Sequence, residues 1–339
     1  MFFIILLSLI CGHFSLPLDD DNSMFANVIS NSIDEDDTID LSRLGPEAFG
    51  SPKNDSGDAV ATWSESSLVN PEELGSYAEG DILIPLRGKN GIRMESLQWP
   101  NGHIPYKVER HFTQREIIMK AIADYHRLTC LRFVPYNGQQ DYIVITGEST
   151  GCWSSVGRIG GRQVVNLQIP GCVSKKGTVL HELLHAVGFF HEQSRPERDE
   201  FVTINYNNIK YGAENNFKKA DPKEVDGYKV SYDYNSVMHY SEYAFSKNSQ
   251  KTIEPRVSGA KLGQRDGLSR GDYSYIIFYT NYIILWYPTQ NCEFVTHRKY
   301  LRQNLKRPGY PRNSHTYLIP KSFSHTKIFN IFELFFSLK

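Results

Sequence analysis

The sequence has almost no net charge. Its 37 Lys and Arg residues nearly balance 38 Asp and Glu residues, and the formal net charge is −1. A chain this close to neutrality has no overall field that attracts nucleic acid or an anionic membrane surface. We therefore expect no nucleic acid partner. Acidic residues gather only near the start, from Asp19 to Asp40, where they are typical of a solvated stretch.

The sequence also lacks an apolar run that favours a membrane helix. Residues Met1–Ile10 are apolar except for Ser8, but this run is too short to span a bilayer. Small and polar residues follow it, as in a secretory signal peptide, and a buried N-terminal strand fits this pattern less well. We assign residues 1–16 to a signal peptide. We expect a secreted, extracellular protein with no stable membrane insertion.

Cysteine is scarce. One of the five cysteines, Cys11, lies in the predicted signal peptide. The other four are Cys130, Cys152, Cys172 and Cys292. An even number in a secreted chain predicts two disulfides, for which three pairings are possible. Free buried thiols are the alternative, and an oxidising compartment disfavours them.

Internal repeats and a phosphate-binding loop are lacking as well. The Gly-rich turn Gly157–Gly161 is not followed by Gly-Lys-Ser/Thr. Residues from about 19 to 80 are polar and weakly periodic, which predicts a loosely structured segment. Regular elements are expected from Trp99 onward, where apolar periodicity predicts strands at 104–108, 131–136, 142–146 and 163–169 and helices at 113–128, 178–190 and 269–280. Capping-box patterns mark two helix starts, Thr113 with Glu116 and Ser269 with Asp272.

The segment from His181 to Glu192 contains the residues of a metal site. His181 and His185 are four residues apart, so a helix places both imidazoles on one face. Gly188 allows a sharp turn that returns His191 as a third ligand, and Glu182 can reach a metal-bound water. Three imidazoles leave one position open, as in a catalytic zinc site. The alternative is a polar surface cluster of histidines. We expect one zinc ion per chain.

This segment resembles the zinc-binding motif of the metzincin metalloproteases. The continuation His191-Glu192-Gln193-Ser194-Arg195 is similar to the astacin family in particular, and Ser236-Val237-Met238-His239-Tyr240 resembles that family's Met-turn. The resemblance also includes Ile104–Tyr106, Gly151–Ser154 and Leu262–Arg265. It therefore extends from about residue 99 to about residue 277.

The resemblance implies an α+β fold with a catalytic domain of two subdomains. The N-terminal subdomain would hold a mixed sheet with long helices, and the C-terminal subdomain would be rich in loops. It divides the chain into the signal peptide, a pro-segment at 17–89, a catalytic domain at 90–292 and an atypical C-terminal tail at 293–339.

The resemblance also implies individual roles. Met238 would form an apolar floor beneath the zinc, and Tyr240 would be a displaceable ligand that stabilises the transition state. Glu192 would be structural and linked to the new N-terminus after activation. Strand Gln163–Leu167 would be the edge on which an extended substrate lies. Cys152 would pair with Cys172, and Cys130 with the cysteine that closes the catalytic domain, for which Cys292 remains.

In this family a pro-segment aspartate occupies the zinc site within a Phe-x-Gly-Asp motif. The corresponding stretch is Ala78-Glu79-Gly80-Asp81, in which Asp81 matches and the aromatic residue does not, although Tyr77 lies one residue earlier. We expect Asp81 to be the zinc ligand of the zymogen. Residues Ile82–Ile84 would anchor the segment on apolar surface, and cleavage around Arg87–Asn90 would release it.

The C-terminal region departs from the family pattern. Tyr273–Asn291 is uncharged and aromatic-rich before Cys292, and Pro308–Pro311 faintly resembles the start of a further module. The sequence predicts a secreted zinc-dependent endopeptidase, made as a zymogen, that cleaves proteins or peptides with Glu182 as general base. The alternative is a secreted, catalytically inactive binding protein whose C-terminus is disrupted. A zinc carrier would not need Glu182.

Overall fold

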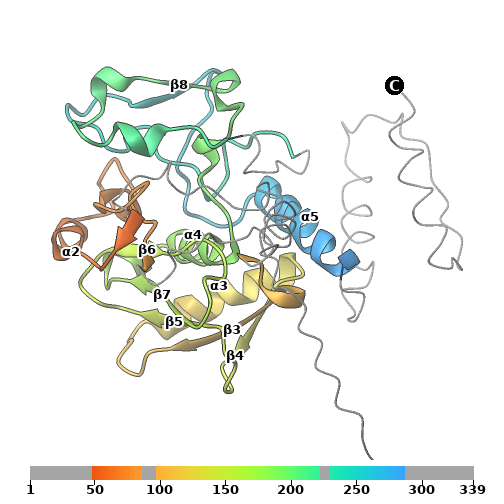
Figure 1. Cartoon of the computed structure of the whole chain (residues 1–339). Coiled ribbons are helices and arrows are strands. Elements are labelled where there is room, and N and C mark those ends of the chain that lie inside the picture. Colours follow the sequence, from red (N-terminus) through yellow and green to blue (C-terminus); the bar gives the residue numbers. More distant parts are fainter. Residues whose placement is uncertain (1–47, 86–96, 222–229, 287–339) are drawn as a thin grey trace, which may run out of the picture. The chain divides into compact units, whose positions relative to one another are not determined.

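The computed structural model describes residues 48–85, 97–221 and 230–286 (Figure 1). Several predictions concern residues outside these ranges: the signal peptide, the cleavage region Arg87–Asn90, Cys292 and the tail at 293–339. In the described part of the chain, no helix combines the length and the apolarity that a bilayer crossing requires.

A five-stranded mixed sheet forms the base of the N-terminal subdomain (Figure 1). Its order is β4-β3-β5-β7-β6, with β3, β4, β5 and β7 parallel and β6 antiparallel to β7. The strands are β3 (His103–Val108), β4 (Arg132–Pro135), β5 (Tyr142–Thr146), β6 (Cys152–Ser154) and β7 (Arg162–Leu167). The core of β5 is the buried run Ile143, Val144 and Ile145. Such a continuous apolar run is typical of a strand that is covered on both faces.

Two helices pack with this sheet, α3 (Arg115–Leu128) and α4 (Lys176–Val187). The helix at 113–128 was predicted correctly, but its capping box was wrong. The residue before the first turn is Gln114, which makes no side-chain cap, and Glu116 pairs with Lys120 at 2.8 Å. Because the helix begins two residues later than expected, Glu116 lies in its first turn, where its exposed side chain pairs with Lys120 instead of capping the helix. The Tyr125 hydroxyl joins the two helices by donating to the Leu180 carbonyl at 2.7 Å.

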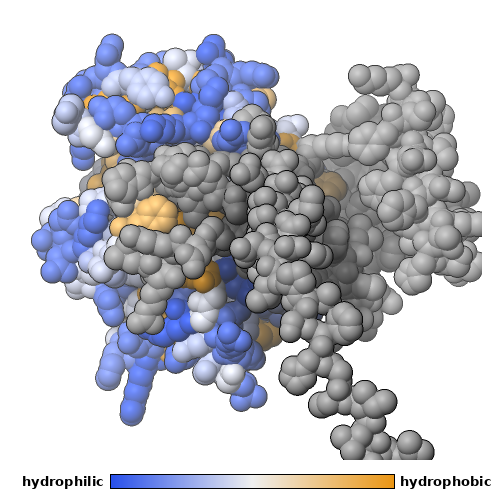
Figure 2. Space-filling model, in the orientation of Figure 1, coloured by the Kyte–Doolittle hydropathy of each residue, from blue (hydrophilic) through white to orange (hydrophobic). Residues whose placement is uncertain are grey.

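The C-terminal subdomain is rich in loops, as expected. Its regular structure includes the short pair β8 (Val202–Ile204) and β9 (Ile253–Pro255), with several short 3-10 helices. A separate apolar cluster stabilises it: Val202, Ile209, Phe217, Tyr232, Tyr240, Ala244, Phe245 and Ile253. The α+β class and the mixed sheet of the predicted fold are confirmed. On the face drawn in Figure 2, the described surface is mostly hydrophilic over both subdomains.

The last helix, α5 (Arg270–Trp286), begins with the predicted capping box. The Ser269 N–H donates to Asp272 Oδ2 at 2.8 Å, and the Asp272 N–H donates to Ser269 Oγ at 2.9 Å. The same carboxylate accepts from the Ser236 hydroxyl at 2.7 Å and from the Val237 N–H at 2.9 Å. Asp272 therefore ties the start of α5 to the stretch that contains Met238.

Residues 48–85 are ordered, which corrects the expectation of a loose segment up to residue 80. They include α2 (Asn54–Ala61), a 3-10 turn at Pro71–Leu74, and the parallel pair β1 (Phe49–Gly50) and β2 (Ile84–Pro85). The segment, orange in Figure 1, lies between the β8 region and the sheet. Its order comes from docking onto other parts of the chain, and such contacts leave no periodic pattern in the sequence.

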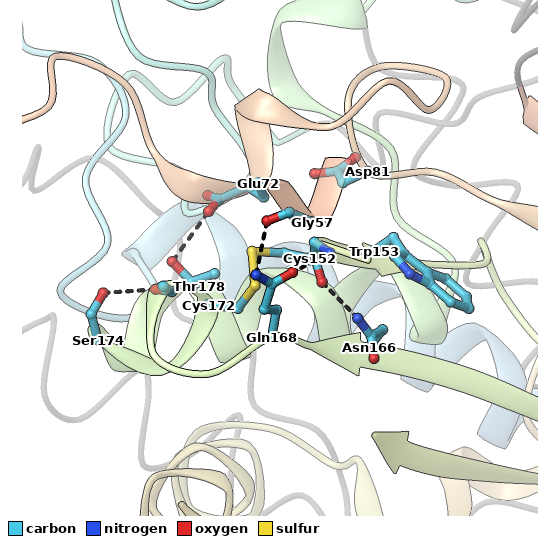
Figure 3. Close-up of a disulfide and its surroundings, with 12 residues drawn as sticks. Gly57, Glu72, Asp81, Cys152, Trp153, Asn166, Gln168, Cys172, Ser174 and Thr178 are labelled. Atoms are coloured by element: carbon cyan, nitrogen blue, oxygen red, sulfur yellow. Dashed lines mark hydrogen bonds between the residues drawn. A yellow bond between two sulfur atoms is a disulfide. The ribbon is translucent and has the colours of Figure 1, made fainter. Parts of the chain in front are cut away.

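Specific contacts fix this segment to the sheet. The Gln168 amide donates to the Gly57 carbonyl at 2.9 Å (Figure 3), and the Tyr77 hydroxyl donates to the Thr150 carbonyl at 2.8 Å. Ile82 and Ile84 pack with Val156, and Leu83 packs with Trp153. The anchoring role expected of Ile82–Ile84 thus corresponds to buried apolar contacts.

A disulfide joins Cys152 in β6 to Cys172, just before α4 (Figure 3). The two Cα atoms are 5.6 Å apart. The bond connects the edge of the sheet to the region from which the His181 helix starts.

Candidate metal centre

Helix α4 carries His181 and His185, and both side chains are buried. All residues from Gly177 to Val187 are buried, so the helix is enclosed by the rest of the fold. It ends at Gly188, whose backbone φ is +131°. Residues other than glycine rarely adopt this conformation. The chain turns there and brings His191 back to the two helical histidines. The ring centroids of the three histidines lie 4.7–5.0 Å apart.

Each imidazole is held through its Nδ1 atom. The His181 ring bonds the Val237 carbonyl at 2.8 Å, and the His185 ring bonds the Phe189 carbonyl at 2.7 Å. The His191 ring bonds the Glu79 carboxylate at 2.7 Å. An Nδ1–H that donates to an acceptor leaves Nε2 as the lone-pair nitrogen, which is the usual arrangement of metal-ligating histidines.

Asp81 places its carboxylate beside the three Nε2 atoms, where it could provide a fourth ligand. Its Oδ2 lies 3.0 Å from His181 Nε2 and 3.3 Å from His191 Nε2, and its Oδ1 lies 3.4 Å from His185 Nε2. The Nε2 atoms of His181 and His185 are 3.1 Å apart. A zinc ion with ligand distances of about 2.0–2.1 Å requires tetrahedron edges of about 3.3 Å. These separations of 3.0–3.4 Å are therefore close to the edges of a tetrahedral zinc site.

The donor atoms also fit a metal chemically. Among the described residues, Asp81 Oδ1 and His191 Nε2 have no hydrogen-bond partner although both are buried. Such atoms are costly unless something satisfies them, and a cation bound at the centre of the group does so. Three imidazole nitrogens and one carboxylate oxygen are ligands that suit zinc.

The charges in the site depend on its burial and its close pairing. Burial acts to raise the pKa of Asp81, but His191 and His185 outweigh it and hold that pKa well below its usual range. Burial acts to lower the pKa of His191, but Asp81 and Glu79 raise it to about 9. Burial, with Arg265 nearby, lowers the pKa of His181 to about 4. A bound metal would replace the proton on His191, since a ligating imidazole is neutral.

Glu182 follows the first histidine on α4 and is completely buried. Within the described residues, neither of its carboxylate oxygens has a hydrogen-bond partner. Burial, with Asp81 and Glu72 nearby, raises the pKa of this carboxyl well above its usual range. A buried carboxyl with spare hydrogen-bonding capacity beside a metal site is suited to receive a proton.

Tyr240 and Met238 lie in the same buried region. The Tyr240 ring packs against the His191 ring with centroids 4.6 Å apart, and its hydroxyl donates to the Glu79 carbonyl at 2.7 Å. Met238 is 3% exposed and belongs to the main apolar core. It follows Val237, whose carbonyl orients the His181 ring. Glu192 bonds Arg195 at 2.9 Å and the Asp233 N–H at 2.8 Å.

Two buried glutamates fix the segment that carries Asp81. Glu72 forms an ion pair with Arg265 in which both side chains are inaccessible, and it accepts from the Thr178 hydroxyl at 3.2 Å (Figure 3). Glu73 accepts from both the N–H and the hydroxyl of Ser241 at 2.6 Å. Gly80 has a φ of +89°, and a Cβ there would lie 3.0 Å from the Glu72 carbonyl oxygen. Only glycine allows the approach that places Asp81 among the histidines.

The edge strand beside the site is β6, and the expectation that residues 163–167 form the edge was wrong. Strand β7 is followed in the sheet by β6, which pairs with it along Val165–Leu167, while β5 pairs with it on the other side. The chain at Asp81–Leu83 pairs in parallel with β6, through Ser154 N–H to the Asp81 carbonyl and Leu83 N–H to the Ser154 carbonyl, both at 2.9 Å. The short strand at Cys152–Ser154 contains no alternating pattern from which its edge position could be predicted.

A family model for astacin, described as a peptidase family, matches residues 91–280, which is more than half of the chain. The chain belongs to the astacin family. The match begins after the described segment 48–85 and includes the three histidines, Glu182 and Tyr240.

Curated relatives agree with the astacin assignment. The chain is 42% identical over 212 residues to zinc metalloproteinase nas-13 of Caenorhabditis elegans. This alignment covers 61% of this chain and 46% of the relative. It is 41% identical over 244 residues to the astacin-like metalloendopeptidase of Mus musculus, and that alignment covers 67% of this chain and 54% of the relative. The chain thus spans about half the length of these relatives. The cofactor of this family is zinc.

A solved structure shares the astacin fold. High choriolytic enzyme 1, a hatching enzyme zinc-protease from the medaka fish Oryzias latipes, aligns with a TM-score of 0.52 and 36% sequence identity. The alignment covers 56% of this chain and 97% of that one.

Several residues of the site were not foreseen in the sequence. The contact of Glu79 with His191, the support of the Met-turn by Asp272, and the pair Glu72–Arg265 all join residues that are distant in the chain. Arg265 belonged to a stretch that resembles the family, but no pattern in the sequence indicated its partner. The proposed partner of Cys130, Cys292, lies outside the described residues, so this pairing stays a prediction.

Zinc removal tests the four-ligand group directly. Zinc at a hundredfold excess over its dissociation constant stabilises a folded protein by about 2.7 kcal/mol. For a domain of this size we expect chelation to lower the melting temperature by about 5–10 °C. His181→Ala should abolish this zinc-dependent difference in scanning calorimetry. His103→Ala, which changes a histidine at the start of β3, should leave it intact; equal loss in both variants contradicts the assignment.

Proposed function

We propose that this chain is the precursor of a secreted zinc-dependent endopeptidase. The observation that supports this best is the convergence of three inward imidazole nitrogens and the Asp81 carboxylate, all within 4.8 Å of one another, beside a buried glutamate. Family membership adds the reaction class. The Cys152–Cys172 disulfide supports an oxidising, extracellular location.

In the released enzyme His181, His185 and His191 would hold the metal. Zinc, when bound, lowers the pKa of water toward neutrality and polarises a carbonyl group. Glu182 receives the proton of the attacking water and later passes it to the leaving amine. Its buried position next to His181 suits it to this role. The Tyr240 hydroxyl, once released from the Glu79 carbonyl, donates to the oxyanion of the transition state.

Extended peptides would bind along the outer edge of β6. In the precursor, the backbone N–H and carbonyl of Ser154 on this edge form hydrogen bonds with residues 81–83 of the segment. A substrate strand would take the same backbone groups once the segment has left, as in other cases of strand addition. Protein or peptide substrates are therefore proposed as partners.

The segment 48–85 would keep the precursor latent. Asp81 takes the position that water needs, and the contacts of Glu72 and Glu73 hold the segment in place. Cleavage around Arg87–Asn90 would release it, after which Glu192 would pair with the new N-terminus. The rival function, an inactive binding protein, gains no support because the metal, base and tyrosine positions are all intact.

Glu182→Gln tests the proposed base. The variant retains the three histidines, so it should bind zinc while the turnover of casein falls by about 10²–10⁴-fold. Metal content and casein digestion are measured on the same activated sample. Turnover near that of the parent would contradict this mechanism.

Tyr240→Phe tests the proposed oxyanion donor. Loss of one such donor costs about 2.7–4 kcal/mol in comparable sites. We expect kcat to fall by the corresponding factor of about 10²–10³, with KM nearly unchanged, in steady-state kinetics on a peptide substrate. A rise in KM at constant kcat would show that the hydroxyl serves substrate binding instead.

Asp81→Ala in the uncleaved precursor tests latency. Without the carboxylate, water can reach the metal, so cleavage of a short fluorogenic peptide should appear without processing. Asp55→Ala is the matched control, because Asp55 is a carboxylate of the same segment that bonds only Ser56 and Ser76 in the described structure. A zinc-loaded Asp81→Ala precursor that stays as silent as the parent rules out Asp81 as the switch.

A further inference from the structure

Glu79 joins the segment to three separate parts of the catalytic region. Its carboxylate bonds His191 Nδ1 at 2.7 Å, its N–H donates to Asn216 Oδ1 at 3.0 Å, and its carbonyl accepts from the Tyr240 hydroxyl at 2.7 Å. The residue is 3% exposed. Glu79 is thus a buried contact of the segment that is separate from the Asp81 ligand.

The three imidazoles differ in the origin of their orienting acceptors. Val237 and Phe189, which serve His181 and His185, belong to the part of the chain that remains after activation. The acceptor for His191 comes from the segment. Because an outer acceptor fixes the ring orientation and raises the basicity of the ligand nitrogen, loss of the segment weakens one ligand in particular.

The backbone at Glu79 is adapted to this contact. Its φ is +48°, in the left-handed region that residues other than glycine occupy at a cost. Such a conformation persists where the surroundings fix it, here through bonds to both backbone groups and to the side chain. The turn directs the carboxylate to His191 and lets Gly80 and Asp81 continue into the metal site.

We propose that Glu79 is a positioning residue for His191, and that the segment makes the precursor bind zinc more tightly than the released enzyme does. This inference rests on the proposed function of the site. The segment then acts in metal loading as well as in latency. On activation, its release lowers the zinc affinity of the site and opens the site to substrate.

The balance of charge supports the same conclusion. A zinc ion held by three neutral imidazoles brings two positive charges into a buried site. Asp81 and Glu79 contribute two carboxylates from the segment, both almost inaccessible to solvent. In the precursor these two carboxylates offset the cost of burying the cation, and each adds an attraction to zinc that the released enzyme lacks.

The test measures zinc affinity in the uncleaved precursor, in a Glu182→Gln background that prevents self-cleavage. Zinc transfer to the chelator 4-(2-pyridylazo)resorcinol gives the dissociation constant, and the visible spectrum of the cobalt(II)-substituted protein reports the ligand geometry. We expect Glu79→Ala to raise the dissociation constant about 10–100-fold and to change the cobalt spectrum. Glu79→Gln should show a smaller effect, since its amide oxygen still accepts from His191.

Tyr77→Phe is the matched control. It removes another buried polar contact of the same segment, the hydroxyl that donates to the Thr150 carbonyl, and this contact involves no histidine. Its zinc affinity should equal that of the parent precursor. An effect as large as that of Glu79→Ala would mean that loose docking, and not the orientation of His191, sets the affinity, and would overturn the proposal.

Two further results separate this inference from the proposed function. If the parent precursor binds one zinc and the released enzyme cleaves casein, but Glu79→Ala binds zinc as tightly as the parent, only the role of Glu79 is wrong. If the parent precursor binds no zinc, the proposed function itself fails. The Glu79→Gln variant, which is nearly the same size as the parent, keeps the test valid if Glu79→Ala does not fold.

Discussion

The Asp81 carboxylate lies among three imidazole nitrogens in the buried interior, and the rest of the molecule is arranged around this contact. In the precursor, Val237, Phe189 and Glu79 hold the outer nitrogens of the three rings so that all three point inward. The carboxylate can reach them only because Gly80 takes a positive φ and because Glu72 and Glu73 are bonded to Arg265 and Ser241. Helix α4, the Met-turn and the segment 48–85 are therefore parts of one polar core.

This core explains how a single segment can control several groups at once. Asp81 faces the metal position, Glu79 bonds both His191 and Tyr240, and residues 81–83 occupy the edge of β6. The group of four possible metal ligands, the tyrosine proposed as transition-state donor and the strand edge proposed to bind substrate are all contacted by a short stretch of chain. Removal of that stretch would free all of them together.

The sequence predicted those parts of the site that local spacing determines. His181, Glu182 and His185 follow from one helical turn, and Gly188 explains the return of His191. Residues joined only by the tertiary fold were missed: Glu79 and His191 are 112 positions apart. The edge strand was misplaced because strand order in a sheet is not local. Likewise, residues 48–80 looked loose because their order depends on burial against the catalytic region, as the contact of Tyr77 with Thr150 illustrates.

In the proposed precursor, a carboxylate of the segment completes the zinc site. A crystal structure of the zinc-loaded, uncleaved protein, with anomalous diffraction at the zinc edge, tests it most directly. We expect one zinc peak within about 2.0–2.2 Å of an Asp81 oxygen and of the Nε2 atoms of His181, His185 and His191. A zinc ion bound elsewhere, or one bound by the three histidines and water with Asp81 turned away, would contradict it.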